Sequence, residues 1–216
     1  MVSFFDYLQV FSFGLFLVIV VADTIYLRRS CQINAFTLGM SHERLQNFLE
    51  ISLFIAVNIW IIETLFSALN LDFRIFPPPL HLPLFDSLTL KSIGAFLIVL
   101  GFAAFILAIV ALGDSWRLGI DKATPASLVT HGIYAISRNP IYGFFNLYFF
   151  GVFLINGTLI HLIFALFVAL NLHYQILGEE KFLEKTHGQS YRDYCAITNR
   201  YFTWRQMTHS PTTDKT

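Results

Sequence analysis

The stretch that decides the fold is residues 90–112, LKSIGAFLIVLGFAAFILAIVAL. Lys91 lies at its edge, and from position 92 onward it carries no charged residue. A helix that crosses the hydrocarbon core of a bilayer needs about 20 predominantly apolar residues. The stretch meets this requirement without interruption, so it predicts a membrane-spanning helix.

Four further apolar stretches surround it, at residues 4–27, 48–69, 141–155 and 158–177. The stretch 141–155 is short for a span, and the turn-forming pair Asn156–Gly157 separates it from the next one. We therefore predict an all-α integral membrane protein with about five transmembrane helices. The last two should form a helical hairpin, with cytoplasmic C-terminal helices after it.

The composition supports this class. Hydrophobic residues make up 56% of the 216 residues and charged residues only 13%, whereas soluble domains carry about 25% charged residues. This shortage excludes a disordered chain, most soluble folds and a nucleic-acid binder that works through excess positive charge. The two cysteines, Cys31 and Cys195, are too few and too widely separated to predict a disulfide scaffold or a metal site.

The basic residues are distributed unevenly between the predicted loops. The chain has 14 basic and 14 acidic residues and no net charge. With five spans, Arg74 and Lys91 are the only basic residues on one side of the membrane. Because cytoplasmic loops are enriched in Lys and Arg, we expect the N-terminus outside and the C-terminus in the cytoplasm.

Two polar segments on the predicted cytoplasmic side carry the unusual sequence. The first follows the third span and contains Gly132-x-Tyr134 and then Arg138-Asn139-Pro140-Ile141-Tyr142. The second follows the fifth span and contains Glu179, Glu180, Leu183, Gly188, Tyr191, Tyr194 and Arg200. Taken singly, the first also fits interfacial aromatic anchors, and the paired glutamates also fit a solvated helix face.

These motifs suggest a division of the chain into three parts. Residues 1–112 would hold three N-terminal transmembrane helices. Residues 113–207 would hold a polar loop that can fold around a ligand, the helical hairpin and a polar C-terminal segment. Residues 208–216 are polar and would form a flexible tail.

Taken in order, the motifs resemble the membrane methyltransferase superfamily that includes isoprenylcysteine carboxyl methyltransferases and phospholipid N-methyltransferases. The family pattern is Gly-x-Tyr, Arg-His-Pro-x-Tyr, Glu-Glu-x-x-Leu and Phe-Gly-x-x-Tyr-x-x-Tyr. The resemblance covers roughly residues 113–202. Asn139 and His187 stand where the family has histidine and phenylalanine, and Asn199 stands where a proline often precedes the final arginine. Asn139 puts any role of a titrating imidazole in doubt.

The resemblance implies an S-adenosylmethionine-dependent methyltransferase. The acceptor would be lipophilic, such as an isoprenylcysteine carboxylate or a phospholipid amine. In this scheme Arg138 and Arg200 hold an anionic acceptor group or order the glutamates, and Glu180 with Arg138 completes the catalytic centre. The expected cofactor-binding residues are His131, Gly132, Tyr134, Asn139, Pro140, Tyr142, Glu179 and Tyr191.

Independently of the resemblance, the chain has no Gly-x-Gly-x-x-Gly motif after a strand, which excludes a methyltransferase of the soluble, Rossmann type. The expected partners are a lipophilic or prenylated substrate and membrane lipids, without nucleic acid. Oligomeric state and acceptor stay open.

Three alternatives remain at this stage. Membrane sterol reductases, which use NADPH, are similar over the C-terminal segment but usually have more spans. A non-enzymatic channel or transporter subunit would show polar residues along several spans. A family member that binds the cofactor without catalysis would be compatible with Asn139.

Overall fold

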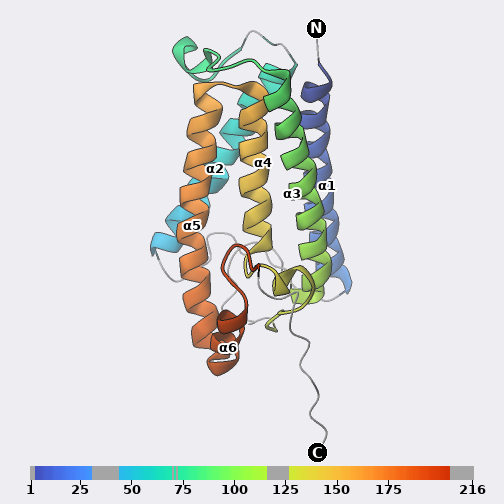
Figure 1. Cartoon of the computed structure of the whole chain (residues 1–216), viewed down its shortest axis with the longest axis vertical. Helices are drawn as coiled ribbons and strands as arrows, with labels where there is room; N and C mark the ends of the chain where they lie inside the picture. Colours follow the sequence, from blue (N-terminus) through green and yellow to red (C-terminus); the bar gives the residue numbers. More distant parts are fainter. Residues whose placement is uncertain (1–2, 31–43, 70, 72, 116–126, 205–216) are drawn as a thin grey trace, which may run out of the picture.

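The computed structural model describes residues 3–30, 44–69, 71, 73–115 and 127–204. Six α-helices are found in this part of the chain, namely α1 (Phe4–Ser30), α2 (Arg44–Ala68), α3 (Leu88–Leu112), α4 (Pro140–Asn156), α5 (Leu159–His187) and α6 (Gln189–Ile197). The first five run up and down alternately, and α4 lies between α3 and α5 (Figure 1). No strand occurs among the described residues, so the prediction of an all-α membrane protein is confirmed. The tail 208–216 lies outside the described residues.

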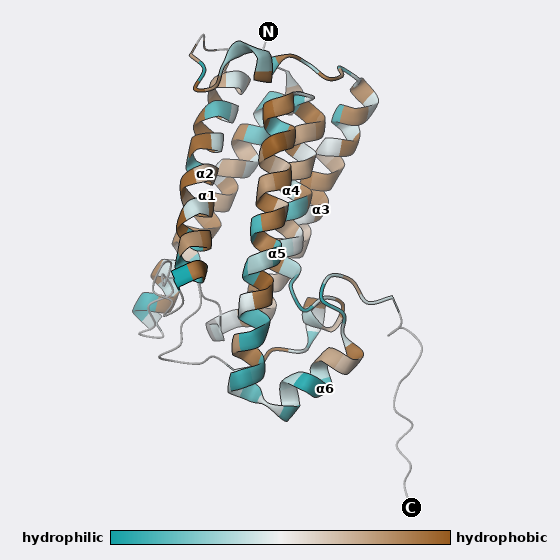
Figure 2. Cartoon of the chain, turned by 90° about the vertical axis from the view of Figure 1, so that its left-hand side faces the viewer, coloured by the Kyte–Doolittle hydropathy of each residue, from teal (hydrophilic) through white to brown (hydrophobic). Residues whose placement is uncertain are grey.

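Four of these helices, α1, α2, α3 and α5, are long and apolar enough to span a membrane, and α4 is a shorter apolar helix. Brown, hydrophobic ribbon dominates the bundle in Figure 2, whereas the lower part of α5 and α6 carry most of the teal, hydrophilic residues. The predicted hairpin is confirmed. Gly157 ends α4 in the left-handed conformation at φ +63°, a backbone conformation that residues with a side chain rarely adopt.

The closest packing in the bundle is between α3 and α4. A Cβ on Gly94 would lie 2.5 Å from the carbonyl oxygen of Gly151, and a Cβ on Gly151 would lie 2.7 Å from that of Gly94. Small residues let membrane helices approach at backbone distance. Below this contact Phe102, Phe105 and Phe144 form a buried aromatic cluster, with Phe105 and Phe144 stacked at 4.6 Å. The glycine contact and the cluster hold α4 in the centre.

The helix α4 is shorter than its neighbours in the bundle. Its 17 residues extend about 26 Å, less than the roughly 30 Å of the hydrocarbon core. Figure 1 shows that the first turn of α4 stops short of the lower ends of α1 and α3. The short helices η2 (Gly113–Ser115) and η3 (Gly132–Ala135) lie at this end. We call it the motif end, because it carries residues 132–142 and 178–204.

The last helix of the hairpin reaches past the membrane. With 29 residues, α5 is about 43 Å long, so its apolar part 159–177 fills the hydrocarbon core and residues 178–187 project beyond it. The opposite end of the bundle is closed by η1 (Pro78–His81). There Glu63, only 1% exposed, accepts a hydrogen bond from the backbone N–H of Ile75 at 2.9 Å. This acid is therefore structural and remote from the motifs.

Candidate active site

Three segments meet at the motif end. The first is η3 with the first turn of α4, and the second is the projecting end of α5 with α6. The third is residues 198–204, which we call the C-terminal strap. The strap returns from α6 and lies against the chain before α4: Arg138 N–H donates to Asn199 O at 3.1 Å and Thr203 N–H to Ile136 O at 2.8 Å. The helical hairpin therefore brings together motifs some 40 to 60 residues apart.

At the centre lies an ion cluster of Arg138, Glu180 and Arg200. Arg138 donates from Nε and Nη2 to Glu180 Oε1 at 3.2 and 2.7 Å. Arg200 donates from Nε and Nη2 to Glu180 Oε2 at 3.0 and 2.6 Å. Both carboxylate oxygens are thus occupied by guanidinium groups, the geometry in which charge-assisted hydrogen bonds are strongest.

The two arginines differ in how far they are enclosed. The Arg138 side chain is 12% exposed, and its Nη1 donates to Thr198 O of the strap at 2.7 Å. The Arg200 side chain is 33% exposed, and its Nη1 donates to no described residue. Arg138 is therefore held between α5 and the strap, whereas the Nη1 edge of Arg200 remains accessible to a further anionic group.

The neighbouring glutamate has a different environment. Glu179 accepts a hydrogen bond through Oε2 from the hydroxyl of Tyr142, at 2.8 Å, and its Oε1 has no partner among the described residues. The two residues are consecutive on α5 but point to different partners, so one carboxylate is neutralised by arginines and the other is not.

The pKa shifts of the two carboxyls follow from this difference. Burial alone would raise the pKa of Glu180, but the hydrogen bonds from Arg200 and Arg138 outweigh it and lower the pKa. Burial raises the pKa of Glu179, which the Tyr142 hydrogen bond opposes only in part; the charges of Glu180 and Glu50 raise it further. Opposed shifts in adjacent acids are typical of functional sites.

Three tyrosines line the cluster. Tyr194 of α6 donates its hydroxyl to Tyr134 O at 2.6 Å, which ties α6 to η3. Tyr134 lies near Glu179, and burial, with that charge, raises the pKa of its hydroxyl. Tyr191 is 3% exposed, and its hydroxyl, which lies next to the Cys195 side chain, has no nitrogen or oxygen partner in the described part of the chain. A buried hydroxyl without a partner costs free energy unless a ligand supplies one.

The remaining predicted residues serve the local fold. Asn139 is buried and donates from Nδ2 to Arg200 O at 3.2 Å, so it fixes the strap. Pro140 begins α4, a position where its missing N–H costs nothing. Gly132 has φ +63° and faces Ala111 of α3. His131 precedes η3 and is exposed.

One neighbour of the site lies outside the motifs. Glu50 of α2 is 3% exposed, and its charge acts on both Tyr142 and Glu179. The periodicity of α2 gave no signal for Glu50. Its position depends on contacts between α2 and α5, such as Asn171 Nδ2 donating to Leu49 O at 3.2 Å.

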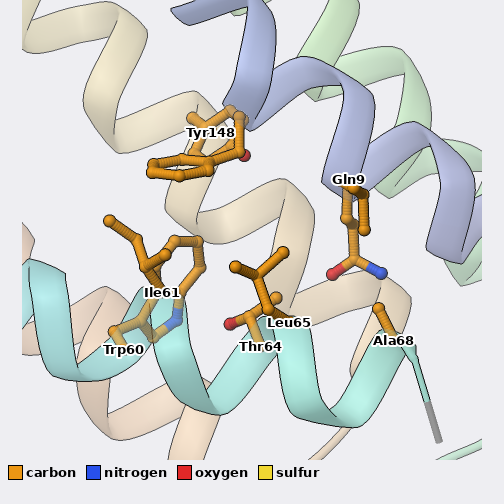
Figure 3. Close-up of a pocket in the computed structure, with 9 residues that line it drawn as sticks. Gln9, Trp60, Ile61, Thr64, Leu65, Ala68 and Tyr148 are labelled. Atoms are coloured by element: carbon orange, nitrogen blue, oxygen red, sulfur yellow. The ribbon is translucent and has the colours of Figure 1, made fainter. Parts of the chain in front are cut away.

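A separate small pocket opens between α1 and α2. Figure 3 shows Gln9 of α1 and Trp60 and Thr64 of α2 around it, with Tyr148 of α4 at its back. Its lining comes from the start of α1 and the end of α2, in the half of the bundle away from the motif end. The pocket is therefore distinct from the candidate active site.

A comparison with protein families finds one similarity over the region that carries the motifs. Residues 90–190, which run from α3 into α6, match the family model described as phospholipid methyltransferase. This family is part of the membrane methyltransferase superfamily, so residues 90–190 are similar to that superfamily. No curated protein matches it in sequence. The matched region includes Arg138, Tyr142, Glu179 and Glu180 but ends before the strap, so Arg200 lies outside it. This similarity supports a membrane methyltransferase and favours neither the reductase nor the non-enzymatic alternative.

Proposed function

We propose that the motif end binds S-adenosylmethionine and transfers its methyl group to a lipophilic acceptor. The observation that carries the proposal is the pair Glu179 and Glu180. Glu180 is held by two arginines, whereas Glu179 keeps an oxygen for a ligand. Two adjacent acids with opposite environments can divide the work between ordering the site and binding a cationic cofactor.

The residues fit the chemistry of this cofactor. S-adenosylmethionine carries an ammonium group, ribose hydroxyls, a carboxylate and a sulfonium. Glu179 Oε1 suits the donors among these groups, and the unpartnered Tyr191 hydroxyl can donate or accept. The accessible edge of Arg200 suits the carboxylate, and a tyrosine face such as that of Tyr134 suits a sulfonium.

When bound, the cofactor supplies an electrophilic methyl group on a positively charged sulfur. Its transfer is an in-line displacement, so the protein has to align the partners and exclude water rather than supply strong acid or base. Glu180 would act here as a positioning residue: it fixes Arg138 and Arg200, which in turn fix the strap. Tyr142 would orient Glu179 through its 2.8 Å hydrogen bond.

For the acceptor we favour a phospholipid amine over a prenylcysteine carboxylate. The buried Glu50 and the partly exposed Glu179 place two carboxyls on the membrane side of the site. Their charge attracts an ammonium headgroup and repels a carboxylate. The charge bias of the loops supports a cytoplasmic position of this end.

Purified protein with labelled S-adenosylmethionine tests the proposal. Vesicles would contain an aminophospholipid, a prenylcysteine or neither, and NADPH binding would be measured in parallel. We expect label in the aminophospholipid and saturable binding of S-adenosylhomocysteine. Label in the prenylcysteine alone would overturn the acceptor assignment. NADPH binding without S-adenosylhomocysteine binding would overturn the cofactor and the reaction.

A further inference from the structure

The C-terminal strap exposes large apolar side chains. Phe202 is 59% exposed and Trp204 86% exposed, with ring centroids 6.1 Å apart. Tyr201 beside them is 48% exposed, and Ile136, on the segment that the strap pairs with, is 43% exposed. Contiguous apolar exposure outside a membrane span marks an interaction surface.

The strap is fixed rather than trailing. Besides its two backbone hydrogen bonds to residues 136–138, Arg200 O accepts from Ser137 Oγ at 3.3 Å and from Asn139 Nδ2 at 3.2 Å. Asn199 N–H donates to Thr203 Oγ1 at 2.7 Å. The exposed rings are therefore presented by an ordered backbone, not by a loose end.

The contact of the strap with α5 indicates how deep in the membrane the strap lies. Tyr201 stacks on His173 with ring centroids 6.3 Å apart and a 24° angle, and its hydroxyl bonds His173 Nδ1. His173 lies about one turn before the end of the apolar part 159–177. Figure 1 shows the strap beside the first turn of α4, above the lower ends of α1 and α3. The strap thus lies at the level where the spanning helices leave the hydrocarbon core.

We propose that the strap is a membrane-interface element whose partner is the phospholipid bilayer, with Phe202 and Trp204 inserted at the boundary between headgroups and acyl chains. The surface is continuous with the lipid-facing part of α5, where Tyr174 is 57% exposed. Aromatic rings prefer this boundary. Because Arg200 lies on the same strap, the bilayer surface reaches within a few residues of the ion cluster. This gives a lipid acceptor a route to the site along the strap.

Tryptophan fluorescence in reconstituted vesicles tests the insertion without any need for methyl transfer. The spectrum of Trp204 is the difference between the wild type and Trp204→Phe, which leaves the core residue Trp60 untouched. Interfacial side chains lie about 5–10 Å into the boundary. We therefore expect phospholipids brominated near the ester end to quench Trp204 more strongly than those brominated near the chain terminus, and aqueous iodide to quench it weakly.

Strong iodide quenching without quenching by brominated lipid would place Trp204 in water and overturn the proposal. Protection from both quenchers would show that protein, and not lipid, covers the strap, and would also overturn it. A second measurement uses Phe202→Ser with Trp204→Ser in intact, folded protein. The double variant should show weaker quenching of Tyr201 emission by brominated lipid than the wild type, where Tyr201 emission is the difference made by adding Tyr201→Phe to each background.

Because neither readout involves the cofactor, their failure and the failure of the proposed methyltransferase activity are distinguishable.

Discussion

The two ends of α4 are fixed by opposite kinds of interaction. Towards the middle and upper part, Gly94 and Gly151 allow backbone contact with α3, and the energy comes from steric fit and apolar packing. At its first turn, the helix is fixed by hydrogen bonds and charges: Tyr142 to Glu179, and Arg138 to Glu180 and the strap. The first region is built for stability, and the second leaves groups for a ligand. Substitutions in the two should therefore separate folding from activity.

The largest effect on activity is expected for Glu180→Gln. It removes the charge that holds Arg138 and Arg200, so both guanidinium groups lose their ionic partner and Arg200 loses its tie to α5. Misplacement by about 1 Å can cost a hundredfold in rate, and we expect at least that loss of methyl transfer. The measurement is initial rate per folded protein. Arg192→Ala is the control, because it breaks only exposed contacts, namely the 3.6 Å pair with Glu184 and two hydrogen bonds to Gln189 Oε1. An exposed ion pair is worth at most about 1 kcal/mol. Equal rates for both variants would contradict the account.

Gly151→Ala should lower the stability of the protein and leave the candidate active site unchanged. Its Cβ would lie 2.7 Å from Gly94 O and 2.8 Å from Ile98 Cγ1, so α3 and α4 must separate. Overpacking of this kind costs about 1–3 kcal/mol, visible as a lower melting temperature in detergent. Affinity of the folded protein for S-adenosylhomocysteine should stay unchanged. Gly14→Ala on α1, which meets no atom within 4 Å, is the matched control and should melt like the wild type. If Gly151→Ala lost affinity for S-adenosylhomocysteine but kept its melting temperature, the proposed difference between the two ends of α4 would be wrong.

The raised pKa of Glu179 predicts the pH dependence of cofactor affinity. The ionised carboxylate would hold the ammonium group of S-adenosylhomocysteine, so affinity should fall as the pH drops through the folded pKa. Because burial raises that pKa, the fall should begin above the ordinary value of 4.5 for glutamate. Titrating the dissociation constant of S-adenosylhomocysteine between neutral and mildly acidic pH measures it. A flat profile in this range would argue against Glu179 as the ligand.

A smaller effect is expected for Tyr142→Phe. The variant keeps the ring but removes the hydroxyl that donates to Glu179. A hydrogen bond to a charged group contributes about 1.5–3 kcal/mol, so cofactor affinity should weaken roughly tenfold, with little change in melting temperature. Tyr7→Phe on exposed α1 provides the comparison. An unaltered affinity in Tyr142→Phe would mean that Glu179 is oriented by other groups.

The fold could be predicted from the sequence to within a few residues at most helix ends. The apolar stretch 141–155 and the turn at Asn156–Gly157 predicted a short helix and a hairpin, and α4 and Gly157 have this form. The length of an apolar stretch and a turn-forming dipeptide are local signals, so they can be recognised in the sequence without knowledge of the tertiary structure. The fifth span was predicted to end at 177, yet α5 continues to His187, because helix continues into water once polar residues with good helix propensity follow the span.

The site could be predicted only in part. The ordered motifs indicated which residues would gather, and Arg138, Glu180 and Arg200 do meet. The sequence held no signal for the pairing of the strap with residues 136–139 or for the approach of Glu50. The strap pairs with residues that lie more than 60 positions earlier in the sequence. Glu50 approaches Glu179 from a different helix. Asn139 illustrates the point: its side chain fixes the strap through Arg200 O, a role that its residue type alone did not indicate.

The most direct test of the central claim is the affinity of Glu179→Gln for S-adenosylhomocysteine, measured by calorimetry beside Glu184→Gln. Both substitutions are on α5 and remove one carboxylate, but Glu184 lies on the exposed side, paired with Arg192. The account predicts a large loss of affinity for Glu179→Gln, no change for Glu184→Gln and similar melting temperatures for both. Wild-type affinity in Glu179→Gln would contradict the assignment of the motif end as the cofactor site.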